Sequence, residues 1–147
     1  MPRALLFAVC DNVLVGQDNS VSLIQITNQF LLSGDIPNPI PPNSATQMRW
    51  YVFAEWEILE DEFEQDFEQR VRLMRDEQTM FETFSDFRTE QGKIIHRMIG
   101  GLTFFPLIPG GLYRMHLDLR RSGAQNPWQN AAQYPLEVIY RHIPVPA

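Results

Sequence analysis

The stretch "FFPLIPGGLYRMHLDL", residues 104–119, decides the fold class, because a sharp chain reversal is followed at once by strict alternation of apolar and polar residues. Pro109 fixes one backbone φ angle and the two glycines after it permit positive φ, so the preceding segment ends there. The apolar positions that follow are Tyr113, Met115, Leu117 and Leu119, and the polar positions are Arg114, His116, Asp118 and Arg120. Period-two alternation predicts an antiparallel strand with one face in the core and the other in water.

Segments on both sides of this strand carry similar signals. Residues 3–15 and 21–32 are rich in aliphatic residues and enclose the turn-forming "GQDNS", which predicts an antiparallel hairpin. Residues 33–47 hold four prolines, which cannot donate to a strand ladder, so they are expected to connect strands across an end of the fold. Gly100 and Gly101 predict a bulge or bend within their strand, and "YPLEVIYRHI" at residues 134–143 is expected to be the closing strand.

Residues 50–76 fit two interpretations. Apolar residues spaced by three or four are typical of a helix face; they are Trp56, Leu59, Phe63, Phe67, Val71 and Met74. Against a helix, "RWYVFAEW" is dense in aromatic and β-branched residues, and "FEQRVRL" alternates between apolar and polar side chains. Two strands joined by an acidic loop near residues 59–65 therefore remain the alternative, and we favour it because the surrounding segments are all β.

These patterns together predict the fold class. Regularly spaced short strands separated by turn signals are typical of a sandwich. We expect residues 1–147 to form a single all-β domain, a two-sheet antiparallel β-sandwich of about seven or eight strands with long connecting loops, immunoglobulin-like or C2-like. An apolar fraction of 44% and a charged fraction of 20% are those of a folded protein.

Charge and cysteine content narrow the function classes. Residues 1–87 carry 15 acidic and 5 basic residues, and residues 88–147 carry 3 and 7, so the net charge of −6 is unevenly distributed. Thinly spread basic residues argue against a nucleic-acid partner, and acidity argues against an anionic membrane surface. The single cysteine, Cys10, cannot form an intramolecular disulfide, and the apolar run near the N-terminus is too short for a signal-peptide core. A cytoplasmic location is expected.

Several segments carry a family resemblance. They are "LLFAVCDNVLVGQDNSVSLIQI", "WYVFAEWE", "FEQRVRL", "FPLIPGGLYRMHLDL" and "YPLEV", which together span nearly the whole chain. In these segments the sequence resembles a family of uncharacterised bacterial proteins, a domain of unknown function. The resemblance implies an immunoglobulin-like or C2-like sandwich, and it brings no catalytic residues, because none are established for such a family.

Signals for chemistry are weak. His96, His116 and His142 fall on three predicted strands, and a metal site would form only if those strands aligned the side chains; no pair has metal-ligand spacing in sequence. Cys10 follows the apolar "LLFAV" and is expected to be a buried small apolar residue, although a neighbouring histidine would make it a candidate nucleophile. The sequence contains no nucleophile elbow, phosphate-binding loop or zinc motif. We therefore predict no catalytic residues, no metal and no cofactor.

Two features suggest contact with a partner. Trp128 lies in a polar loop, where it either folds back on its own domain or, if exposed, anchors an interface. Eight acidic residues fall between Glu55 and Glu68 with no basic residue among them, which indicates a solvated loop or a docking surface for a basic partner. The predicted partner-binding residues are Trp128, Glu60, Asp61, Glu62 and Glu64.

The function predicted from these features is that of a non-enzymatic cytoplasmic binding or structural module. It would act through contacts with a protein partner, or through self-association at an open sheet face or edge. Whether it binds a small-molecule ligand is left open by the sequence. The alternative is a metal-dependent hydrolase or a Ca²⁺-responsive domain that uses the acidic stretch 55–68 and a histidine. The acidic stretch is mostly glutamate and has no glycine, so it fits a calcium loop poorly.

Overall fold

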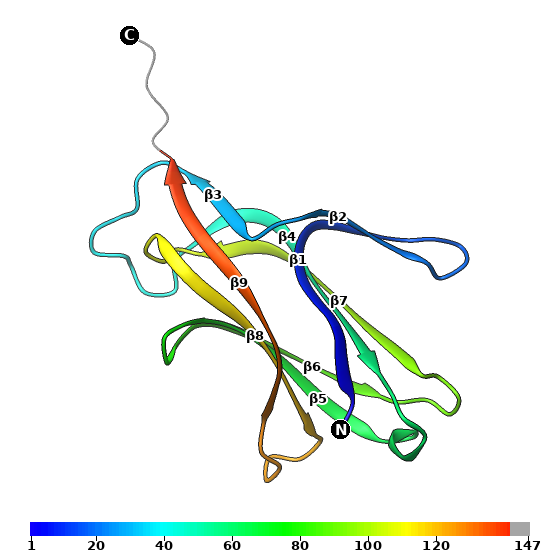
Figure 1. Cartoon of the computed structure of the whole chain (residues 1–147). Helices are drawn as coiled ribbons and strands as arrows, with labels where there is room; N and C mark the ends of the chain where they lie inside the picture. The colour runs from blue at the N-terminus through cyan, green and yellow to red at the C-terminus, as the bar shows by residue number, and fades with distance from the viewer. Residues whose placement is uncertain (142–147) are drawn as a thin grey trace.

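The computed structural model describes residues 1–141 and consists of two stacked β-sheets (Figure 1). The strands are β1 (Arg3–Val15), β2 (Val21–Ile26), β3 (Gln29–Ser33), β4 (Ala45–Glu57), β5 (Asp66–Arg75), β6 (Gln78–Arg88), β7 (Ile95–Pro106), β8 (Gly111–Arg121) and β9 (Gln129–Arg141). A single 3₁₀ turn, η1 (Glu60–Glu62), lies between β4 and β5 within these residues. The predicted all-β, two-sheet sandwich is confirmed.

The two sheets have the strand orders β2-β1-β4-β7 and β3-β9-β8-β5-β6. All pairs are antiparallel except β3 with β9, which is parallel. Within residues 1–141 the sandwich therefore is not wholly antiparallel, and it has one strand more than the seven or eight predicted. The extra strand arises in the segment that the sequence predicted as one hairpin arm, residues 21–32. Thr27 and Asn28 separate β2 from β3, and the chain passes there to the other sheet without reversing its direction (Figure 1).

Residues 50–76 form strand, turn and strand, as favoured from their aromatic and β-branched content. The apparent helix face arises because core-facing residues of two different strands, Trp56 on β4 and Phe67 and Val71 on β5, fall by chance at helical spacing. Leu59 would lie on the buried stripe of such a helix, yet it is 55% exposed in the turn. The spacing of apolar residues on two strands, counted across the turn between them, therefore coincides with the period of a helix, and residues 50–76 contain no such helix.

The prediction of a bulge at Gly100 and Gly101 is wrong. Strand β7 pairs with β4 in continuous register through both glycines, and the irregularity in this pair lies between Gln47 and Trp50. Gly101 serves instead to make room for an aromatic ring, because a Cβ atom there would lie 3.0 Å from Cε1 of Tyr51 on the neighbouring strand. The absent side chain lets the Tyr51 ring lie against the backbone of β7.

The core between the sheets is built from side chains that alternate along each strand. Its largest buried members are Trp50, Trp56, Phe67, Phe105, Leu73, Met115, Leu117, Leu119 and Leu136. Both indole N–H groups are satisfied: Trp50 Nε1 donates to the backbone oxygen of Phe104 at 2.7 Å, and Trp56 Nε1 donates to Gln69 Oε1 at 2.9 Å. Gln69 is thus a buried polar residue that the core requires.

The hairpin of β1 and β2 belongs to the four-stranded sheet, and its tip reaches the opposite edge strand of that sheet, β7. Phe53 alternates with Val52 and Ala54 of the core, so its side chain points away from the other sheet, yet it is only 1% exposed. At the hairpin tip, the backbone oxygen of Asn19 accepts a hydrogen bond from Arg97 Nη1 of β7 at 2.6 Å. This hydrogen bond therefore fixes the hairpin tip to β7, the strand at the opposite edge of the sheet.

The loops divide between the two ends of the sandwich. The N-terminus and the connections 58–65, 89–94 and 122–128 gather at the lower end in Figure 1, whereas 34–44, 76–77 and 107–110 lie at the opposite end. The segments that contain Trp128 and the acidic turn are thereby brought to the same end of the fold, although they are far apart in sequence.

Candidate binding surface

Trp128 folds back onto the outer face of the five-stranded sheet and keeps partial exposure. The guanidinium carbons of Arg70 on β5 and Arg120 on β8 lie 4.4 Å and 4.3 Å from its ring centroid. Phe84 on the edge strand β6 lies 6.2 Å away and is 59% exposed. We call Arg70, Phe84, Arg120 and Trp128 the Trp128 surface; it joins an exposed aromatic ring to a tryptophan held by two cations.

The loop before Trp128 is shaped to return the chain to the sheet. Gly123 adopts a φ of 130°, which disfavours any side chain, and the backbone N–H of Asn126 donates to its oxygen at 3.0 Å. The Asn126 amide then donates to the backbone oxygens of Arg121 (3.2 Å) and Ser122 (3.1 Å). This closed turn directs Trp128 over the end of β8 rather than away from the domain.

A buried carboxylate lies beneath this surface. Asp118 is 1% exposed although its position on β8 faces away from the core. Arg72 donates to both of its oxygens (2.6 Å and 3.3 Å), Arg70 donates to Oδ2 (2.9 Å) and the Asn130 amide donates to Oδ1 (3.0 Å). Burial alone would raise the pKa of Asp118, but the hydrogen bonds from Arg72, Asn130 and Arg70 and the charge of Arg72 outweigh it and lower the pKa.

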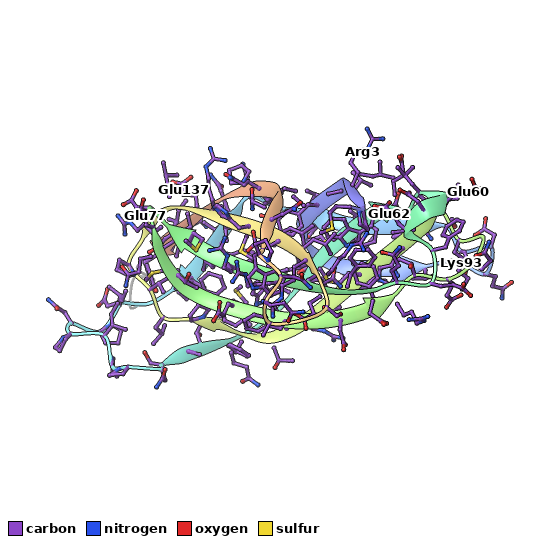
Figure 2. All side chains as sticks on the ribbon, turned by 90° about the horizontal axis from the view of Figure 1, so that it is seen from below. Arg3, Glu60, Glu62, Glu77, Lys93 and Glu137 are labelled. Atoms are coloured by element: carbon purple, nitrogen blue, oxygen red, sulfur yellow. The ribbon has the colours of Figure 1, made fainter. Side chains whose placement is uncertain are left out.

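Only some of the residues predicted to contact a partner from the acidic turn are exposed to solvent. Glu60, Asp61 and Glu64 are exposed, whereas Glu62 is 3% exposed. Glu62 Oε1 accepts a hydrogen bond from the backbone N–H of Leu59 at 2.9 Å, and Oε2 lies 2.8 Å from the Met1 amino group. Figure 2 shows Glu62 among the crowded interior side chains and Glu60 at the periphery. Glu62 therefore stabilises the turn, whereas Glu60, Asp61 and Glu64 are the predicted contact residues of this turn that solvent reaches.

Thr89 fixes the acidic turn to the start of the β6–β7 connection. It is 3% exposed, and its hydroxyl donates to the backbone oxygen of Glu62 at 2.5 Å while accepting from the backbone N–H of Gln65 at 2.9 Å. The backbone of Thr89 also pairs with Glu64 and Gln65. A lone threonine in a polar loop carries no sequence signal for this role, so it was not predicted.

The Trp128 loop and the acidic turn meet through the backbone. The N–H of Ser122, which begins the loop, donates to the oxygen of Asp66, which follows the turn, at 3.0 Å. The loop that carries Trp128 is therefore hydrogen-bonded, at its first residue, to the residue that begins β5 after the acidic turn.

The histidines and the cysteine do not form a common site in the described part of the chain. His96 lies on β7 of the four-stranded sheet and stacks on Phe87 at 4.0 Å, whereas His116 lies on β8 of the other sheet beside Asn130. His142 lies outside the described residues. Among residues 1–141, no three or more His, Cys, Asp or Glu side chains are grouped to hold a metal ion. Cys10 is fully buried, and burial together with the Asp11 charge raises its pKa.

Comparison of the sequence with protein families finds no match, and comparison with curated proteins finds none either. The resemblance to an uncharacterised bacterial family therefore stays a prediction, while the β-rich fold rests on the structure. Residues 1–141 contain no helix with the length and hydrophobicity that crossing a membrane requires.

Proposed function

We propose that this protein is a non-enzymatic cytoplasmic recognition module that binds a protein partner at the loop end of the sandwich. The observation that carries the proposal is the Trp128 surface, in which a half-buried tryptophan is held between two arginines beside a phenylalanine that is 59% exposed. Tryptophan and arginine are the residues most enriched among energetically dominant interface positions. The exposed ring of Phe84 provides the apolar area that such a centre needs.

The acidic turn supports the same location. The Trp128 loop is hydrogen-bonded to Asp66, shortly after the exposed carboxylates of Glu60, Asp61 and Glu64, so a partner that covers the Trp128 surface and extends toward this turn would meet negative charge at its rim. Rim charges of this kind mainly accelerate and orient association rather than supply affinity. We therefore infer a partner with a basic patch beside an apolar contact.

The test is affinity capture from the native cell lysate with quantitative identification of the bound proteins. Phe84→Ala removes an exposed ring from the Trp128 surface, and Leu112→Ala is the matched control, because Leu112 is 75% exposed at the opposite end of the same sheet. A partner retained by Leu112→Ala and reduced at least tenfold by Phe84→Ala supports the proposal. Equal recovery by both variants would place the interface elsewhere.

A triple substitution of Glu60→Gln, Asp61→Asn and Glu64→Gln tests the acidic turn separately from the Trp128 surface. If the captured partner is basic as inferred, the triple variant should associate more slowly at low salt and resemble the parent protein at high salt. An unchanged association rate at low salt would remove the acidic turn from the interface.

A further inference from the structure

A second site lies between the end of β6 and the start of β7, where the β1–β2 hairpin tip approaches the β6–β7 connection. It is a hollow of about 310 Å³ whose charged and polar lining residues are Asn19, Arg88, Thr89, Glu90, Lys93, His96 and Arg97. Four of these seven side chains are basic residues and one is acidic, in a chain of net charge −6. Lys93, which Figure 2 places at the same end of the molecule as Glu60, is the single lysine of the whole sequence.

The arginine at the back of the hollow is fixed in place. Arg97 Nε donates to Glu55 at 3.0 Å and Nη1 donates to the Asn19 backbone oxygen at 2.6 Å, which leaves the Nη2 amino group for a ligand. Asn19 itself is held in a turn with a positive φ of 62°. Arg97 therefore presents a preorganised donor, which lowers the ordering cost of binding an anion.

The other two permanent cations are paired but movable. Arg88 contacts Asp66 with both side chains 59% exposed, and Lys93 contacts Glu90 with exposures of 67% and 62%. Exposed pairs of this kind contribute about 0–1 kcal/mol, so either head group can leave its carboxylate for a multiply charged anion at little cost.

His96 adds an imidazole ring to the lining of the hollow. Its ring is half-buried and lies flat on Phe87, with centroids 4.0 Å apart and an angle of 10° between the planes. No hydrogen bond to its ring nitrogens is found among residues 1–141. Burial is the main reason that the pKa of His96 is lowered, with Glu90 acting to raise it and Lys93 to lower it. A bound anion would raise the pKa of His96, against the lowering that burial and the Lys93 charge cause.

From this arrangement we propose that the hollow formed by Arg88, Lys93, His96 and Arg97 binds a tetrahedral oxyanion, as a free phosphate or as the phosphate group of a small molecule. The volume lies at the lower end of the roughly 300–1,000 Å³ typical of ligand sites, so it admits the anion with a small organic group. This site shares no residue with the Trp128 surface, although Arg88 lies at the end of β6, the strand that also carries Phe84.

The test is a titration with inorganic phosphate, and in parallel with O-phosphoserine, at constant ionic strength set with chloride. The readout is the ring-proton resonance of His96 by NMR, identified with His96→Phe, which can keep the stack on Phe87. We expect saturable shifts, and at least tenfold weaker binding in the double variant Arg88→Gln, Lys93→Gln. The matched control Arg114→Gln removes an exposed arginine outside the hollow and should change the affinity by less than twofold.

The two ligands distinguish the source of the anion: tighter binding of phosphoserine indicates a phosphorylated small molecule, and equal or tighter binding of phosphate indicates the free ion. A pH series with sulfate, which keeps its charge across this range, adds a second readout. Because a nearby anion stabilises the protonated ring, saturating sulfate should raise the pKa of His96 by roughly one unit or more. Shifts that fail to saturate, or an equal loss of affinity in Arg114→Gln, would overturn the proposal.

Discussion

Removal of the Asp118 carboxylate is expected to lower the free energy of unfolding by about 3 kcal/mol, because it would leave two partly buried arginines without their partner. Asp118 is 1% exposed and accepts four hydrogen bonds, two from Arg72, one from Arg70 and one from Asn130. The arginine side chains are 17% and 20% exposed, so they can turn partly toward water. That freedom sets our value at the lower end of the roughly 3–5 kcal/mol found for broken buried pairs.

The assay is urea unfolding of Asp118→Ala at neutral pH, followed by circular dichroism. Glu57→Ala is the matched control, since it breaks the Arg3–Glu57 pair, whose side chains are 71% and 34% exposed, and should cost at most about 1 kcal/mol. A loss in Asp118→Ala no larger than in the control, with an unchanged urea dependence, would refute the reasoning. It would mean that the arginines recover full hydration when the carboxylate is removed.

The pH dependence gives an independent check through Asp118→Asn, which keeps the shape and removes the charge. The folded-state pKa of Asp118 is lowered, so its stabilising effect is fully present above the unfolded pKa of about 3.9 and is lost as pH falls through the folded pKa. The stability difference between the parent protein and Asp118→Asn should therefore be constant near neutral pH and shrink below about pH 4. A difference that does not shrink in acid would show that charge is not its cause.

Two further predictions concern the core. Gln69→Leu should cost about 1–3 kcal/mol in urea unfolding, because the buried Trp56 N–H would lose its acceptor, whereas Gln133→Leu at an exposed position should have little effect. Cys10, fully buried and with a raised pKa, should react with a thiol reagent only as fast as the protein unfolds, and reaction in the folded state at the rate of a free thiol would contradict the burial found here.

The side on which a residue lies could be predicted from sequence, but how deeply it is buried could not. Alternation correctly assigned Tyr113 and Met115 to the core and Asp118 to the opposite face. It could not show that Asp118 is buried there, because the side chains that contact it come from other strands: Arg70 and Arg72 from β5 and Asn130 from β9. The burial of Glu62 could not be predicted for the same reason: local charge indicated a solvated stretch, and only the approach of Leu59 and Met1 shows that its carboxylate is enclosed.

Arg70 links the stability of the five-stranded sheet to the Trp128 surface, since it donates to Asp118 and also lies over the Trp128 ring. A change at Asp118 should therefore alter both unfolding and any binding at Trp128, and loss of binding in such a variant would not identify a contact residue. Substitution of Trp128 is also ambiguous. It removes a proposed contact residue and at the same time uncovers Arg70 and Arg120, so it should alter both binding and stability. Phe84 avoids both problems, since it is 59% exposed and its ring centroid lies 6.2 Å from that of Trp128. It is therefore the residue at which recognition can be measured separately from folding.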